Sequence, residues 1–96
     1  MKIVPDEART LEQLEELAER LGLTIRYEAL GREGDPAPVR GGLCRVNDRQ
    51  IIFVDERLGV MERIVVLAEA LGRFDLSEVF VSPAIRRLVT RSAEWG

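Results

Sequence analysis

Hydrophobic residues in the first quarter of the chain recur with the spacing of a helix. Charged residues, mostly glutamates, fill the positions between them, which is the pattern of an amphipathic helix with one apolar face. Thr10 followed by Gln13 has the form of a capping box, while Asp6 offers a start one turn earlier. Gly22 is expected to end the helix. The apolar face comprises Leu11, Leu14, Leu17, Ala18 and Leu21.

Three β-prone runs follow this helix, separated by turn-forming residues. Apolar and polar side chains alternate over residues 23–28, which predicts a half-buried strand. Glycines and prolines between residues 31 and 38 predict an exposed loop. Two further strands, over residues 43–46 and 50–54, flank Asn47-Asp48, a pair that suits a tight hairpin turn.

Two details of this hairpin indicate its surroundings. Residues 51–54 are apolar at every position, so we expect the second strand of the hairpin in the middle of the sheet. Gly41 and Gly42 stand just before the first strand, where glycines indicate a bulge or a close approach between two backbones.

The second half of the chain carries two more helical patterns. Residues 60–74 form the more hydrophobic one, whose apolar positions extend beyond one face, so we expect a central and largely buried helix. Ser82-Pro83 gives the last helix an N-cap with proline at its first helical position. Trp95 is expected to dock on the body of the protein or on a partner. The inner face of the last helix comprises Ile85, Leu88 and Val89, with Arg86, Arg87 and Arg91 outside.

Together these elements predict a single α+β domain over residues 1–96. A small three-stranded, mostly antiparallel sheet is packed by an N-terminal helix, a central hydrophobic helix and a C-terminal helix. A chain of 96 residues is long enough to bury one hydrophobic core but not two.

Composition narrows the classes of function. The 14 basic and 17 acidic residues leave a net charge of −3 with both signs mixed, which argues against a strongly basic nucleic-acid-binding protein. No run of about 18 apolar residues is present, so no membrane span is predicted. The first residues break too early for a signal peptide, and we expect a cytoplasmic protein. Lys2 is the only lysine, which fits a GC-rich genome at least as well as a thermophilic source.

The absence of histidine and the single cysteine limit the chemistry further. Without histidine, this chain can form neither a Ser-His-Asp triad, nor a Cys-His pair, nor a histidine zinc site. Cys44 has no second cysteine with which to form an internal disulfide. Either Arg40 and Arg45 activate Cys44 as a reactive thiol, or Cys44 is a small buried residue packed opposite Ile51, and we favour the second interpretation.

Residues 51–74 carry a resemblance to a known family. The string IIFVDERLGVMERIVVLAEALGRF is a strand, an acidic turn and a helix that ends Leu-Ala-Glu-Ala-Leu-Gly-Arg-Phe. It resembles the corresponding segment of zincin-like metallopeptidases of the ImmA/IrrE type, whose helix reads roughly Leu-Ala-His-Glu-Leu-Gly-His. In that family two histidines one turn apart hold zinc and the glutamate activates water. The resemblance implies a zincin-like order of elements, which the predicted order is compatible with.

All three chemical positions of that motif are changed in this chain. Glu69 stands at the first histidine position, Ala70 at the general-base position and Arg73 at the second histidine position. Alanine cannot abstract a proton, and arginine is always protonated and cannot ligate zinc. The spacing of Glu69 and Arg73 predicts an i,i+4 ion pair in place of the metal ligands. The resemblance therefore implies a degenerate scaffold with no catalytic residue, metal or cofactor.

A second resemblance covers most of the chain. The runs Gly-Gly-Leu-Cys-Arg-Val, Leu-Ala-Glu-Ala-Leu and Pro-Ala-Ile-Arg-Arg-Leu are similar to shared features of small bacterial proteins of about this length. This similarity implies no activity.

We therefore expect a non-catalytic module that self-associates, most simply as a homodimer, or binds a protein partner. Met61, Val66, Ala70 and Trp95 are too many apolar residues for so small a body to cover, so an exposed patch is expected.

Two alternatives stay open. In the first, Arg40, Arg45 and the backbone amides of Gly41 and Gly42 bind a small anion such as phosphate or carboxylate. A solvated strand face explains the same residues. In the second, arginines of the last helix contact nucleic acid, which we consider unlikely because few aromatic residues accompany them.

Overall fold

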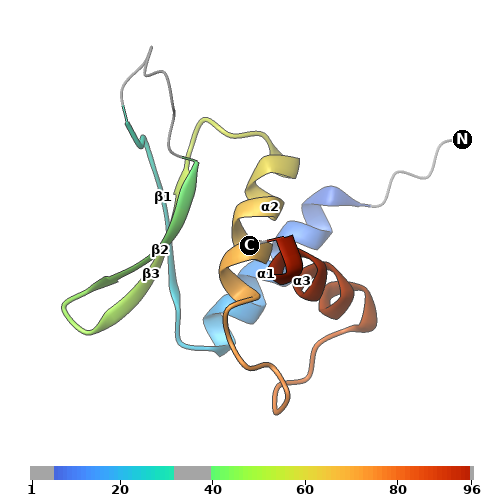
Figure 1. Cartoon of the computed structure of the whole chain (residues 1–96). Helices are drawn as coiled ribbons and strands as arrows, with labels where there is room; N and C mark the ends of the chain where they lie inside the picture. The colour runs from blue at the N-terminus through green and yellow to red at the C-terminus, as the bar shows by residue number, and fades with distance from the viewer. Residues whose placement is uncertain (1–5, 32–39, 96) are drawn as a thin grey trace, which may run out of the picture.

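The computed structural model describes residues 6–31 and 40–95. Three helices lie together on one face of a three-stranded sheet, and the opposite face of the sheet carries no helix in the described chain (Figure 1). The predicted α+β class with three strands and three helices is confirmed. In chain order the elements are α1 (Glu7–Arg20), β1 (Thr24–Glu28), β2 (Gly41–Val46), β3 (Arg49–Asp55), α2 (Val60–Leu71) and α3 (Pro83–Trp95).

The sheet has the strand order β1-β3-β2, so β3 occupies the middle, as predicted. Strands β2 and β3 form an antiparallel hairpin through Asn47 and Asp48, whose φ angles of 50° and 67° are those of a type I′ turn. Strand β1 pairs with β3 in parallel. The sheet is therefore mixed rather than mostly antiparallel, because the segment after β1 carries the chain across to the far edge instead of turning back beside β1.

Helix α1 begins and ends at signals present in the sequence. Asp6 is its N-cap and accepts a hydrogen bond from the Arg9 amide at 3.2 Å, so the earlier of the two predicted starts is used and Thr10 lies inside the helix. At the other end Gly22 has a φ of 80°, and the Leu23 amide donates to the Ala18 carbonyl at 2.9 Å. This is a Schellman ending, which the glycine predicted.

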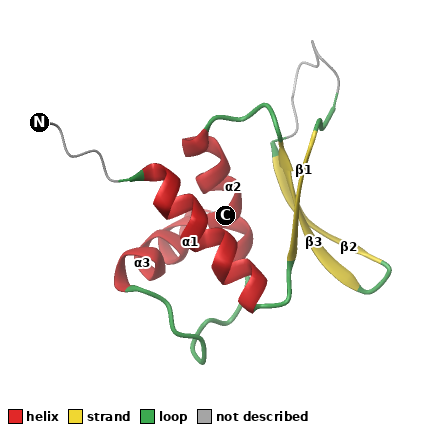
Figure 2. Cartoon of the chain, turned by 180° about the vertical axis from the view of Figure 1, so that it is seen from behind, coloured by secondary structure: helices red, strands yellow, loops and turns green. Residues whose placement is uncertain are grey.

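The core lies between the sheet and the helices. Ile52 and Val54 of β3 are fully buried against the helical layer, as is Leu67 of α2. Helix α2 contacts β2, β3, α1 and α3, so its predicted central position is confirmed (Figure 2). It is less buried than predicted, since six of its 12 residues are buried and Val60, Met61 and Val65 are exposed. Helix α3 packs through Ile85 and Val89, also as predicted.

A polar cluster fastens β1 to the helices. The Tyr27 hydroxyl donates a hydrogen bond to the Glu15 carboxylate of α1, and the Arg63 guanidinium lies 5.0 Å from the Tyr27 ring centre. Burial above all, and then the hydrogen bond to Glu15 and its negative charge, raise the pKa of Tyr27 well above its ordinary value, although the charge of Arg63 opposes this. Tyr27 is therefore a neutral donor that ties the sheet to α1.

A second cluster fastens the end of β3 to the segment after β1. The Arg57 guanidinium donates hydrogen bonds to both carboxylate oxygens of buried Asp55, at 3.0 and 2.8 Å. It also donates to the Leu30 carbonyl at 2.6 Å. The Arg57 side-chain hydrogen bonds, followed by the bond from the Arg57 amide, lower the pKa of Asp55 from 3.8 to about 2. This pair fixes the carboxyl end of the parallel β1–β3 pair.

Some sequence predictions fall outside the described chain. The predicted loop between residues 31 and 38 lies there except for Gly31, and nothing is described of the Trp95 side chain. In the described part of the chain, no helix combines the length and the apolar character needed to cross a bilayer.

Candidate functional site

The fold brings the glycine pair of β2 beside the three changed motif positions, which are Glu69 and Ala70 of α2 and Arg73 just after it. They line one hollow of about 90 Å³, far smaller than the 300–1,000 Å³ of a typical ligand pocket. Five of the seven site residues predicted from the sequence therefore meet, although the sequence assigned them to two separate sites. Arg40 and Arg45, the other two, are exposed and do not line the hollow. The lining residues are Gly41, Gly42, Leu43, Val66, Glu69, Ala70 and Arg73.

The close backbone approach predicted at the glycine pair occurs at Gly41. A Cβ atom on Gly41 would lie 2.1 Å from the Phe53 carbonyl oxygen and 3.0 Å from a Val66 methyl group. The φ of Gly41 is 153°. Gly42, the next residue, has open space where its Cβ would lie. Gly41 is thus required for the close approach of β2 to the Phe53 carbonyl of β3 and, less strictly, to Val66 of α2, whereas Gly42 is not.

The motif positions on α2 do not fit a zinc ion. Ala70 is 4% exposed and carries no proton acceptor, and Arg73 cannot ligate a metal. Glu69 is the one carboxylate in the hollow, where a tetrahedral site needs three or four ligands. Across the described residues, no three acidic or cysteine side chains gather closely enough to hold a metal ion.

The predicted ion pair between Glu69 and Arg73 is wrong. Ion pairs among the described residues join Arg26 to Glu28 and Arg57 to Asp55, and Glu69 takes no part in one. Helix α2 ends at Leu71, and the Arg73 amide bonds to the Ala70 carbonyl, three residues back, at 3.2 Å. This tighter last turn places Arg73 outside the regular i,i+4 geometry that the pair requires.

The outer side of β2 is an open sheet edge. The Asp55 amide donates to the Arg40 carbonyl at 2.8 Å, so the even-numbered residues of β2 form the hydrogen-bonded pairs with β3. The backbone groups of Gly41, Leu43 and Arg45 consequently point away from β3. No described strand lies on that side, since β2 ends the strand order.

Two apolar residues of α2 are exposed. Met61 is 55% exposed and Val65 37% exposed, and with Glu69 they have i,i+4 spacing along the helix. Of these three residues, Glu69 lines the hollow beside β2, whereas Met61 and Val65 do not. Val66 and Ala70, which we predicted to share this exposed patch, are instead buried against β2.

Cys44 does not lie where we expected it. It pairs with Ile51 in the register of β2 and β3, as proposed, but its side chain is exposed on the sheet face without helices. The alternation of β2 explains this, because Leu43 faces the helices and its neighbour must face away.

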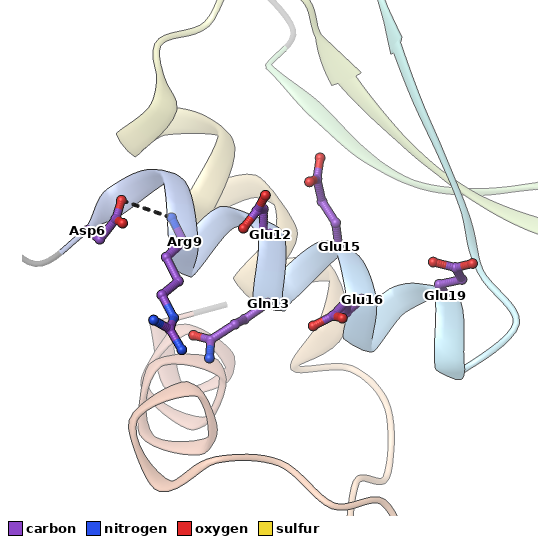
Figure 3. Close-up of a pocket in the computed structure, with 7 residues that line it drawn as sticks. All are labelled: Asp6, Arg9, Glu12, Gln13, Glu15, Glu16 and Glu19. Atoms are coloured by element: carbon purple, nitrogen blue, oxygen red, sulfur yellow. Dashed lines mark hydrogen bonds between the residues drawn. The ribbon is translucent and has the colours of Figure 1, made fainter.

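Two wider hollows lie on the helices. One of about 720 Å³ lies along the solvent face of α1, where the carboxylates of Glu12, Glu16 and Glu19 point apart (Figure 3). This is the charged face of an amphipathic helix. The other, of about 860 Å³, is an open groove between α1 and α3, bordered by Arg87 and Arg91. The first hollow contains none of the predicted site residues, and the second is bordered by the arginines of the last helix that the nucleic-acid alternative invoked.

The sequence suggested an edge strand for association but did not identify β2 as that edge, and it missed the exposure of Val65. The residues were visible, but their exposure depends on which strand lies outermost and on how α2 is rotated. No protein-family model, curated protein or solved structure matches this chain. The zincin-like relationship therefore stays a prediction.

Proposed function

We propose that this protein is a non-catalytic interaction module that self-associates through the open edge of β2. One observation carries the proposal: the backbone groups of Gly41, Leu43 and Arg45 point outward from β2, at an edge that no described strand covers. Such an edge offers hydrogen bonds to a strand from another chain.

Strand β2 lacks most of the features that prevent an edge strand from pairing with a strand of another molecule. Natural edges are protected by lysine, proline, bulges or inward-pointing charges. Strand β2 reads Gly-Gly-Leu-Cys-Arg-Val and contains one charge, Arg45, and no proline. Its Val46 side chain is 42% exposed. This composition favours pairing over protection.

The hollow supports a binding role more than a chemical one. Its changed motif positions supply neither a general base nor a metal site, as the site geometry and the absence of histidine indicate. The alternative of an anion site is weaker, because Arg40 and Arg45 do not line the hollow and the Glu69 carboxylate there offsets the positive charge of Arg73.

Sedimentation equilibrium of the purified chain over a wide range of concentrations tests the proposal. We expect a dimer that dissociates on dilution, and native mass spectrometry should show twice the chain mass without added ligand. A monomer at every concentration would contradict the proposal. A retained small molecule would point to the anion site instead.

A proline variant examines the edge directly. Arg45→Pro removes an N–H group that points away from β3, so the hairpin should persist. Two symmetric copies lose this donor, which should raise the dissociation constant by about tenfold or more. Circular dichroism checks the fold. Val46→Pro is the matched comparison, because its N–H group bonds to β3 and its loss should unfold the hairpin.

A further inference from the structure

We infer that the strand that pairs with β2 is β2 of a second copy, related by a twofold axis at Leu43. This inference rests on the proposed function and gives it a register and a pair of recognising side chains. In this arrangement Arg45 of each copy enters the hollow of the other and pairs with Glu69. The six strands of the two copies then form one continuous sheet.

The ladder of β2 limits the registers that a twofold axis allows. Only the residues whose backbone groups point outward can form hydrogen-bonded pairs across the edge, and these are Gly41, Leu43 and Arg45. A twofold axis at Leu43 pairs Leu43 with its own copy and Gly41 with Arg45. Axes at Gly42 or Cys44 instead place Leu43 opposite Gly41 or Arg45.

The register at Leu43 matches side chains by size. Gly41 and Arg45 lie on the helix-facing side of the sheet, since Leu43 between them faces the helices. Gly41 has no side chain, and its neighbourhood is the hollow of about 90 Å³. The long Arg45 side chain of the second copy would lie directly across from Gly41. Strand β2 therefore provides both the hollow beside Gly41 and the Arg45 side chain that enters the hollow of the other copy.

The same register matches charges. Glu69 lines the hollow beside Gly41, and neither Glu69 nor Arg45 belongs to an ion pair within the described chain. A dimer of this kind forms two equivalent Arg45–Glu69 contacts, one for each copy. Because each copy supplies both partners, the surface is self-complementary, which is what a twofold interface requires. This selects a second copy rather than an unrelated strand.

A disulfide across the edge tests the register. On the face without helices, Gly42 lies opposite Cys44 of the second copy in a non-hydrogen-bonded pair, with Cα atoms about 4.5 Å apart, a distance that a disulfide spans. Gly42→Cys has open space for its side chain. Mild oxidation should therefore convert this variant to a covalent dimer on non-reducing gels. The wild type should stay uncrosslinked, because its two Cys44 residues lie diagonally at about 7–8 Å.

The double variant Gly42→Cys with Cys44→Ser is the matched control and should not crosslink. A charge exchange gives an independent readout. Arg45→Glu and Glu69→Arg should each weaken the dimer by about tenfold or more, and the two changes together should restore it. Arg73→Ala removes the other charge of the hollow and should not weaken the dimer.

The outcomes separate this inference from the function on which it rests. A chain that is monomeric at all concentrations overturns both. A dimer that Gly42→Cys fails to crosslink, with no loss on charge reversal, overturns the register while self-association stands. Crosslinking together with rescue by the double charge exchange would establish the edge, the register and the Arg45–Glu69 contact.

Discussion

The two faces of the three-stranded sheet differ in how completely the chain covers them. On the helix-facing side, Ile52 and Val54 are fully buried beneath α2. On the other side only the middle strand is sheltered: Ile51 is 7% exposed, whereas Cys44 and Val46 on the edge strand are exposed. In the described ranges, 6–31 and 40–95, the helices cover one face of the sheet and none covers the second.

The comparison indicates that stability and interaction are separated in this molecule. The buried face should hold most of the free energy of unfolding, since buried apolar area is the main stabilising term. The open face and the β2 edge should tolerate substitution and serve association. The following predictions test that separation, beginning with the largest expected effect.

Two valines allow a direct comparison of the buried face and the open edge. Val54→Ala should lower the free energy of unfolding by about 2–3 kcal/mol, because it removes buried methyl groups and leaves a cavity. Val46→Ala, at an exposed site on the hairpin, should change it by less than about 0.5 kcal/mol. Urea denaturation of the two variants, under conditions where the chain is monomeric, measures the difference. Equal losses would contradict the separation.

The two glycines of β2 make the same comparison at adjacent residues. Gly41→Ala forces a methyl group against the Phe53 carbonyl and Val66, and should cost about 2 kcal/mol or more. Gly42→Ala meets open space and should stabilise the strand by about 0.4–1 kcal/mol. Thermal denaturation should separate the two variants in opposite directions from the wild type. A tolerated Gly41→Ala would show that β2 does not approach the Phe53 carbonyl of β3 and Val66 as described.

A variant of Tyr27 tests whether a polar contact on the buried face also contributes to the free energy of unfolding. Tyr27→Phe removes the hydrogen bond to Glu15 and should cost about 1 kcal/mol. Because its pKa is raised, the Tyr27 hydroxyl stays protonated in the folded chain at pH values where a free tyrosine ionises. Its contribution to the free energy of unfolding is therefore present below about pH 10 and is lost as the pH rises further. Tyr27 is the only tyrosine, so ultraviolet titration follows it alone. Ionisation at an ordinary pKa would contradict the contact.

Asp55 should change how the free energy of unfolding depends on pH: its contribution is present at neutral pH and disappears in acid. Its pKa is lowered to about 2 in the folded state, so the unfolded chain binds the proton first as the pH falls. The stabilisation is therefore present above about pH 4 and is lost between about pH 4 and 2. Asp55→Asn should flatten the fall in the free energy of unfolding over this interval. Parallel pH profiles for Asp55→Asn and the wild type would argue against the Arg57 contact.

Local features of the fold could be predicted because nearby residues encode them. The Asp6 cap, the Gly22 ending, the Asn47-Asp48 turn and the Ser82-Pro83 helix start depend on a few consecutive residues. The central positions of β3 and α2 could also be predicted. A strand that is apolar on both faces, or a helix whose apolar residues extend beyond one face, is expected near the centre of the fold. Strand direction was less accessible, because the parallel pairing of β1 depends on where a long connection takes the chain.

The candidate site divides in the same way. The sequence identified the glycine pair and the changed motif positions. It also showed that the residues at those positions cannot act as a general base or complete a metal site. It could not show that Gly41 and Glu69 share one hollow, because contacts between distant segments depend on the packing of α2 on β2. The failed Glu69–Arg73 pair has a similar origin, since the spacing assumed a helix that continues past Leu71.

The sequence alone determined the elements and the limits on chemistry. Without histidine and with one cysteine, the chain has no triad or histidine metal site in any fold, because the groups themselves are absent. The tertiary structure alone decided which surface stays open. Edge position, helix rotation and the uncovered sheet face arise from the way α2 fills one side of β3 and β2, and residues far apart in the chain together fix that packing.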